Sequence, residues 1–187
     1  PMDNSNTTLD EFRYQQRGYA KYGDIARLFG WQALKDFFYQ ENLDFNAGKL
    51  TCFESPVCLD GLAQVDSRIL RLSKAAGADL TPLIHFWGVH PDNSTALAQA
   101  ITAAGLDNST IVRDKLVYYA GIAPTNNAQF NTHFETVFPG RPEGGHPDYG
   151  VGWYNVWRDS FNESHGAQIT TTIQSLLTKY FPGTNLP

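Results

Sequence analysis

The sequence predicts an all-α fold, an irregular orthogonal bundle of about eight or nine short helices with one long loop rich in glycine and proline. Three observations predict it. Apolar residues recur every three or four positions along most of the 187 residues, which is the period of a helix face. Glycine and proline interrupt this pattern at short intervals. No segment has the convincing alternation of a strand. We therefore expect a single helical domain with a possible seam near residues 106–110.

The first two predicted helices are separated by Gly30. The first covers residues 9–29, and two internal glycines weaken its pattern. Its expected apolar face consists of Phe12, Tyr19, Tyr22, Ile25, Ala26 and Phe29. The second runs from Trp31 to near Asn42, with spacings of three and four along its inward stripe. That stripe consists of Trp31, Leu34, Phe37 and Phe38. Residues 43–59 lack a period and are predicted to form an ordered loop.

Three more helices are predicted between residues 60 and 105. Asp60 is a plausible N-cap for the first of them, which Gly77 ends. Thr81 followed by Pro82 is typical of a helix start, because proline lacks the N–H group that would have no partner there. This pair predicts a short helix over residues 82–87. Residues 91–94 then open a helix that ends at Gly105.

The second half of the chain is predicted to hold the remaining helices. Ser109 or Thr110 caps a helix that stops at Gly121, and the others cover residues 125–138, 152–161 and 163–181. Residues 139–150 contain four glycines and three prolines, so they must form a loop. The run from residue 169 to residue 173 is β-branched and suits a strand by propensity. Its apolar spacing, which continues to residue 180, favours a helix.

Composition excludes several classes of partner. The hydrophobic share of 42%, with 12 Phe, 9 Tyr and 4 Trp, is typical of a folded protein. The net charge is −5 and the 14 Lys and Arg residues are scattered, so we expect no nucleic-acid partner. No run of 18 apolar residues occurs, which predicts no membrane span. The polar beginning, residues 1–8, has no charged and then apolar leader, and we expect it to be a boundary within a longer protein.

Two cysteines, Cys52 and Cys58, lie in the predicted loop. Five intervening residues that include a proline can bring their Cα atoms within disulfide range, and such a bond would indicate a compartment outside the cytosol. Two buried free thiols are the alternative. A zinc site is disfavoured, because no pair of histidines has a matching spacing. Four Asn-x-Ser/Thr sequons begin at Asn6, Asn93, Asn108 and Asn162, and they matter only where the source glycosylates its proteins.

Motifs of catalysis are missing from the sequence. His133-Phe-Glu135 is the nearest fragment to a His-Glu-x-x-His motif and lacks the second histidine. A nucleophile elbow, a Walker loop, a dinucleotide fingerprint and an EF-hand loop are also missing. His85 and His90 flank Trp87 and are expected to be structural. We therefore assign no catalytic residue and no metal ligand to this chain.

The long loop is the candidate binding site, because long loops within compact domains are frequently functional. Aromatic rings beside charged groups suit a polar ligand such as a sugar or a peptide. The candidate residues are Arg141, His146, Asp148, Tyr149 and Trp153. The alternative is an ordered crossover whose aromatic residues belong to the core. A hydrolase that uses Glu143 or Asp148 has little support, since spacing within a loop fixes no distance between two carboxylates.

Residues 22–39 and 66–89 resemble the M60-like, enhancin-type zinc metallopeptidases. The first stretch contains Phe29-Gly30-Trp31, and the second contains Gly77-Ala78-Asp79-Leu80 and closes with Trp87-Gly88. The likeness covers about residues 10–105 and concerns the helical region that follows the catalytic motif in that family. It implies a parent enzyme that is secreted or displayed at the cell surface, acts on mucin-like glycoproteins and uses zinc. The zinc ligands and the catalytic glutamate of that family would precede residue 1, so none is carried over.

Two hypotheses follow for function. In the first, the chain is the C-terminal helical subdomain of an M60-like metallopeptidase, with no cofactor of its own. It forms a wall of the cleft and packs against an upstream catalytic domain of the same polypeptide, which holds the zinc. In the second, the chain is a separate helical module that binds glycan or protein through residues 139–157.

Overall fold

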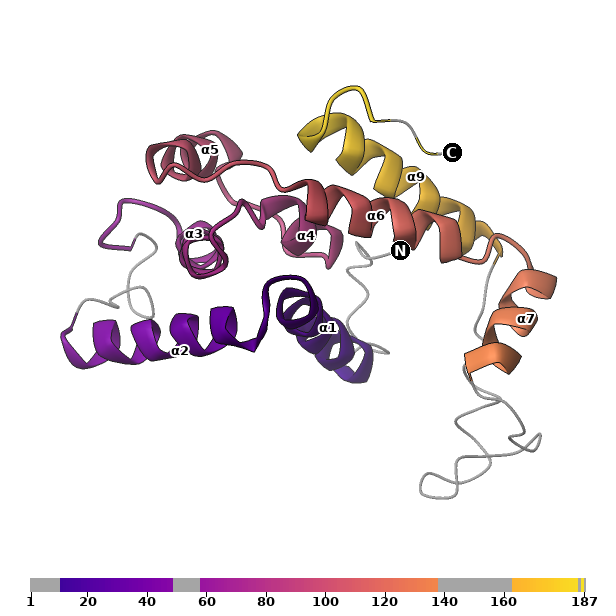
Figure 1. The fold of residues 1–187 in the computed structure, drawn as a ribbon, viewed down its shortest axis with the longest axis horizontal. Coiled ribbons are helices and arrows are strands. Elements are labelled where there is room, and N and C mark those ends of the chain that lie inside the picture. The colour runs from indigo at the N-terminus through magenta and orange to yellow at the C-terminus, as the bar shows by residue number, and fades with distance from the viewer. Residues whose placement is uncertain (1–10, 49–57, 138–162, 185, 187) are drawn as a thin grey trace, which may run out of the picture.

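The computed structural model describes residues 11–48, 58–137, 163–184 and 186. Within these ranges the chain forms eight helices (Figure 1). They are α1 (Glu11–Phe29), α2 (Trp31–Asn46), α3 (Gln64–Ala76), α4 (Thr81–Phe86), α5 (Ser94–Ala103), α6 (Thr110–Ile122), α7 (Asn127–Val137) and α9 (Glu163–Tyr180). The only β-type pairing in the described ranges is an isolated parallel bridge between Asp79 and Asn108. The predicted all-α fold is confirmed.

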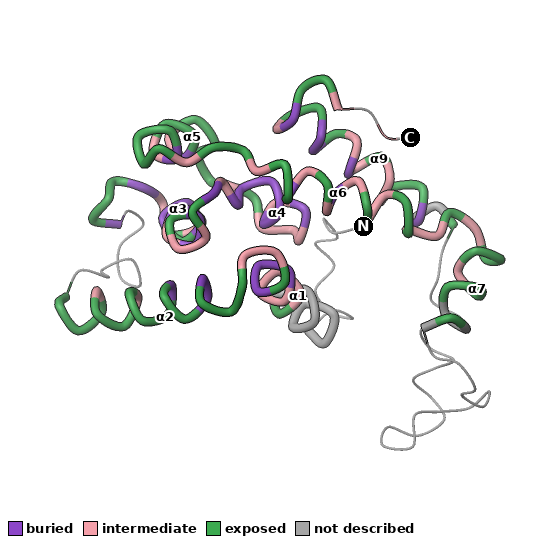
Figure 2. Tube along the Cα trace, viewed as in Figure 1, coloured by how far each residue is buried: buried purple, intermediate pink, exposed green. Residues whose placement is uncertain are grey.

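The shortest helix, α4, lies at the centre of the arrangement. It packs against α3, α6 and α9, and Figure 2 shows it as a largely buried segment inside a mostly exposed periphery. Five of its six residues are buried, His85 being the exception. Residues buried on α1, α2, α3, α5, α6 and α9 join those of α4 in one hydrophobic cluster. This cluster includes residues from both sides of the segment 106–110, where the sequence indicated a possible seam.

The junction of α1 and α2 forms at Gly30, as predicted. Gly30 has a φ of 85°, a backbone conformation that residues other than glycine rarely adopt. Two predictions about the apolar faces are wrong. On α1, Tyr19 is 74% exposed, and on α2 Trp31 is 70% exposed and Phe38 is 48% exposed. The helices α1 and α3 pack against α2 on the side of its buried residues Ala33, Leu34 and Phe37.

Two predicted N-caps, Asp60 and Thr81, are not the N-caps of their helices. Asp60 does not cap α3, whose N-cap is Ala63. The Asp60 carboxylate instead accepts hydrogen bonds from the backbone N–H of Leu62 (3.1 Å) and from Ser67 Oγ (2.6 Å). Thr81 is the first residue of α4 and not its cap. Asp79 Oδ1 accepts the Thr81 N–H at 2.8 Å, so the acceptor that the start of α4 requires comes from the preceding turn.

One boundary differs from the prediction: α2 continues past residue 42 to Asn46, with side-chain hydrogen bonds between residues four apart along its last turns. Most of the other boundaries lie close to those predicted. Gly77 ends α3 in the left-handed conformation with φ 69°. Asn93 caps α5 and Ser109 caps α6, each through its side-chain oxygen. The β-branched run near residue 170 is helical within α9. Gly166 of α9 is buried against the Pro124 carbonyl, and a Cβ atom there would overlap that oxygen. Of the described helices, none is long and apolar enough to cross a membrane.

Candidate functional site

The predicted binding loop lies outside the described residues. This applies to Arg141, His146, Asp148, Tyr149 and Trp153, and also to the carboxylate pair Glu143 and Asp148. The loop site therefore stays a prediction. Cys58 is 6% exposed and takes part in a disulfide bond. Its predicted partner, Cys52, lies outside the described residues, so the pairing of these two cysteines stays a prediction.

A buried polar cluster joins α1, α4 and α6. Its centre is Asp24, a residue of α1 that is 2% exposed. The indole Nε1 of Trp87 donates to Asp24 Oδ2 at 2.9 Å, and the Tyr119 hydroxyl lies 2.7 Å from both carboxylate oxygens. Lys115 Nζ lies 3.6 Å from Asp24 Oδ1. We call these four residues, Asp24, Trp87, Lys115 and Tyr119, the Asp24 cluster.

The electrostatics of the Asp24 cluster favour a structural role for the Asp24 carboxylate. Burial raises the pKa of Tyr119 well above its ordinary value, and its hydrogen bond to Asp24 raises it further. The Tyr119 hydroxyl therefore stays protonated and donates a hydrogen bond to the carboxylate. Lys115 Nζ also lies 4.4 Å from the centre of the Tyr119 ring, so the electron-rich face of the ring attracts the ammonium group. Because two hydrogen-bond donors and a cation already engage the carboxylate, it has little capacity left for a substrate.

Two more buried polar residues fix the turns between helices. Asp66 is fully buried in α3, and its two carboxylate oxygens accept the backbone N–H groups of Asp92 (2.9 Å) and Asn93 (2.8 Å). Ser73, also fully buried, accepts the Leu80 N–H through its hydroxyl at 3.0 Å. Each of these side chains satisfies a backbone group that would otherwise be costly to bury. The polar residues of the core thus hold the connections on both sides of α4.

A cavity of about 400 Å³ lies between α5, the segment 106–108 and the end of α9. Leu97 and Ile101 supply apolar walls, while Asp79, Asn108 and Tyr180 supply polar ones. The Tyr180 hydroxyl lies 3.0 Å from His85 Nδ1. Burial, and then the nearby negative charge of Asp79, raise the pKa of Tyr180 to about 12. The hydroxyl is therefore a neutral hydrogen-bonding group at physiological pH and is no candidate for a base.

His85 and His90 have the structural surroundings that the sequence predicts. Their rings meet edge to face with centroids 4.4 Å apart, and His85 also lies edge-on to the ring of Tyr180. These contacts tie α4 and the turn after it to the end of α9. His133, on α7, is exposed.

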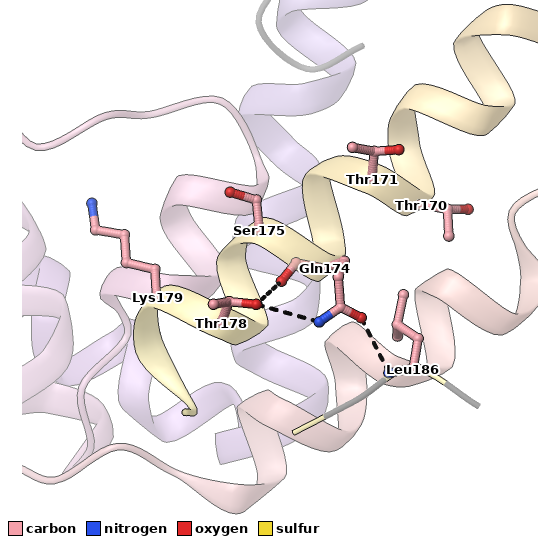
Figure 3. A pocket seen from close by; sticks show the side chains of 7 residues that line it. All are labelled: Thr170, Thr171, Gln174, Ser175, Thr178, Lys179 and Leu186. Atoms are coloured by element: carbon pink, nitrogen blue, oxygen red, sulfur yellow. Dashed lines mark hydrogen bonds between the residues drawn. The ribbon is translucent and has the colours of Figure 1, made fainter. Parts of the chain in front are cut away.

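A second, more open depression follows one face of α9 and has a volume of about 710 Å³ (Figure 3). Thr171, Ser175 and Thr178 present hydroxyl groups there, and Leu186 closes one side. The Thr178 hydroxyl donates to the Gln174 carbonyl at 2.9 Å, and Gln174 Oε1 accepts the Leu186 N–H at 3.2 Å. Part of its polar lining is thus bound to the helix itself or to the C-terminal segment. Among the described residues that line the depression, Lys179 is the only charged one.

The part of the chain that the structure describes contains no group of three or more His, Cys, Asp or Glu residues that could hold a metal ion. The zinc that the family resemblance implies therefore has no suitable ligands among these residues. Comparison of the chain with protein-family models, with curated proteins and with solved structures found no match.

Reasoning from the sequence missed the Asp24 cluster. Lys115 and Tyr119 are four residues apart on α6, but no spacing rule connects them with positions 24 and 87. The one available signal was Asp24 itself, a charged residue between Tyr22 and Ile25 on the apolar face of a helix. A carboxylate at such a position needs a buried partner.

Proposed function

We propose that this chain is the helical scaffold of a secreted M60-like metallopeptidase that acts on mucin-like glycoproteins. In this proposal the zinc site belongs to a preceding part of the same polypeptide. The present residues form one wall of its cleft and hold that wall rigid. The contact between Trp87 and Asp24 carries the proposal, because it joins the two stretches that resemble the family. Asp24 lies in the first stretch and Trp87 closes the second, and they meet at 2.9 Å.

The buried polar groups support a scaffold role. Asp24, Asp66 and Ser73 all lie within the resembling stretches, are nearly or fully buried, and bind groups of neighbouring helices or turns. A residue that is locked by packing and by hydrogen bonds can position another element within the narrow tolerance that an active site requires. The resembling residues are therefore of the kind that a supporting wall needs.

The outward face of α2 supports the presence of a partner domain. Trp31 is 70% exposed, Tyr39 is 67% exposed and Phe45 is 61% exposed. Large exposed apolar patches commonly mark interaction sites. In the proposal, this face packs against the upstream catalytic domain.

The test compares residues 1–187 with a polypeptide extended at its N-terminus through the upstream gene sequence. We expect the extended protein to bind about one zinc ion per chain and to cleave a mucin-type glycoprotein. We expect residues 1–187 alone to do neither. The matched control is the extended protein with the glutamate of its His-Glu-x-x-His motif changed to glutamine, which should keep zinc and lose cleavage. Stoichiometric zinc in residues 1–187, or an upstream sequence without that motif, would refute the proposal.

A further inference from the structure

The sequence has more N-glycosylation sequons than its composition predicts. It contains 12 Asn, 9 Ser and 15 Thr in 187 residues, so random order would produce about one or two Asn-x-Ser/Thr triplets. Four occur, at Asn6, Asn93, Asn108 and Asn162. The bonded state of Cys58 is an independent sign of an oxidising compartment. In eukaryotic cells, such a compartment is also where sequons receive oligosaccharides.

Asn93 presents its side chain to solvent from a rigid turn. The residue is exposed, as are Ser94 and Thr95, which complete its sequon. Its backbone N–H is held by the buried carboxylate of Asp66 at 2.8 Å. Its side-chain oxygen Oδ1 accepts the Ala96 N–H at 3.0 Å and so caps α5. Only the oxygen of the amide takes part in this cap, and the nitrogen Nδ2 has no hydrogen-bond partner among the described residues.

Asn108 uses the other atom of its amide. Its Nδ2 donates to the backbone carbonyl of Tyr180 at 2.8 Å, which joins the segment 106–108 to the end of α9. Asn108 also lines the 400 Å³ cavity together with Lys179 and Tyr180. Asn108 is exposed as well, but its Nδ2 is bonded to the end of α9, so a substituent on that nitrogen would have to fit beside this helix end.

We infer that Asn93 is an N-glycosylation site of the folded domain and that Asn108 is not. The donor would be an oligosaccharide linked to a polyprenyl diphosphate. The Asn93 Nδ2 atom forms a bond to the anomeric carbon, while the bond from that carbon to the diphosphate oxygen breaks. The diphosphate leaves with the electron pair, and a carboxylate of the transferase takes the amide proton. This inference holds whether or not the chain belongs to a peptidase.

The position of the glycan decides whether a modified chain can reach this folded structure. Oligosaccharide transfer takes place on chains that are not yet folded, so both sequons are open to the transferase. A glycan on Asn93 leaves Oδ1 in place, and the cap of α5 survives. A glycan on Asn108 has to lie against the end of α9 and crowds the cavity, so chains modified there should be retained and degraded. The secreted protein should then carry its glycan at residue 93.

The experiment is secretion of residues 1–187 from a eukaryotic host, together with a reporter glycoprotein whose sequon is fully occupied. Enzymatic removal of the glycans in heavy-oxygen water, followed by peptide mass spectrometry, measures occupancy at each asparagine. We expect Asn93 to be occupied in most secreted molecules, and Asn108 to be occupied at least tenfold less. Cell-free translation with microsomes measures the occupancy of each asparagine before any chain is secreted. Asn108 should be occupied more often there than in the secreted protein.

Two variants that keep both asparagines serve as a matched pair. Thr95→Ala removes the first sequon and should reduce the mass by one glycan without changing the melting temperature of the deglycosylated protein. Thr110→Ala removes the second sequon and should leave the glycan mass unchanged. If Thr95→Ala is not secreted, Asn93→Asp removes the acceptor nitrogen and keeps the capping oxygen. An unmodified Asn93 beside an occupied reporter, or equal occupancy of Asn93 and Asn108 in the secreted protein, would overturn the inference.

Discussion

The helices α2 and α4 belong to one bundle but differ in how much of each is buried. In α4 five of the six residues are buried, whereas in α2 only three of the 16 are. Two of its six residues, Thr81 and Ile84, are β-branched, and a helix of six residues does not persist alone in water. Its helical state therefore depends on its neighbours.

The helix α2 packs one face against α1 and α3 and carries side-chain hydrogen bonds along its exposed face. Gln32 donates to Asp36 at 2.7 Å, Gln40 donates to Asp44 at 2.9 Å and Asn46 donates to Asn42 at 2.9 Å. All three pairs are four residues apart, the spacing that stabilises isolated helices. The comparison teaches that the helical state of α4 depends on the packing of the whole core. The outer face of α2, by contrast, should tolerate substitution. Substitutions in the two regions should therefore differ strongly in cost.

The largest effect is expected from Asp24→Ala. The substitution removes the carboxylate that holds Trp87 at the end of α4, and it leaves Lys115, whose side chain is 15% exposed, without its counter-charge. Removal of one partner from a buried ion pair costs about 4 kcal/mol, and we expect a loss of that size in the free energy of unfolding, measured by urea denaturation. The matched control is Asp36→Ala on α2, which removes an exposed carboxylate that accepts a hydrogen bond from Gln32 and should cost less than about 0.5 kcal/mol. Equal losses for the two variants would contradict the comparison.

A smaller loss is expected from deletion of an apolar side chain in α4. Leu83 is fully buried, while Leu43 on α2 is 44% exposed. Leu83→Ala should lower the free energy of unfolding by about 3 kcal/mol, because a cavity remains in the core. Leu43→Ala removes the same atoms and should cost less than about 1 kcal/mol. Urea denaturation of both variants decides the matter, and similar costs would mean that α4 is not the packed centre.

The same contrast explains how much of the fold could be predicted from the sequence. Helix ends at glycine, such as Gly30 and Gly77, were predictable because backbone conformation there depends on the residue itself. The exposure of Trp31 was not, because helical spacing defines a face but does not say where neighbouring helices stop covering it. The N-caps of α3 and α4 were misplaced, because Asp60 and Asp79 bind groups two residues onward, and several nearby residues fit the same cap pattern.

The candidate sites were harder to predict than the fold. Asp24, Trp87 and Tyr119 come together only through the packing of three helices, which no local pattern encodes. The cavity beside Tyr180 likewise requires α5 and the end of α9 to meet. By contrast, the structural role of His85 was predictable, since it lies in an apolar run between Ile84 and Phe86. Local chemistry was readable in the sequence, and contacts across long separations were not.

A moderate effect is expected at alkaline pH. The pKa of Tyr180 is raised to about 12 in the folded protein, against an ordinary value near 10 in the unfolded chain. Between these two values the unfolded chain releases the Tyr180 proton before the folded protein does, so the free energy of unfolding falls as pH rises above about 10. The raised pKa of Tyr119 acts in the same direction.

The Tyr180→Phe variant tests this pH dependence. It should lose about 1 kcal/mol at neutral pH with its hydrogen bond to His85. Its stability should then fall less steeply than that of the unsubstituted protein above pH 10. Tyr39→Phe, at an exposed position of α2, is the control and should leave the slope unchanged. Urea denaturation in steps from about pH 8 to pH 11 gives the slopes, and identical slopes for Tyr180→Phe and the unsubstituted protein would refute the assignment.

The smallest effect is expected from Trp31→Ala. Trp31 is the first residue of α2 and is 70% exposed, so its loss from residues 1–187 should change the free energy of unfolding by less than about 0.5 kcal/mol. The same substitution sharpens the comparison when it is made in the N-terminally extended polypeptide. If the outer face of α2 packs against the upstream domain, Trp31 is buried there and its removal should cost several times more. A cost of the same small size in both proteins would remove α2 as the contact surface, while leaving the buried arrangement around α4 as it stands.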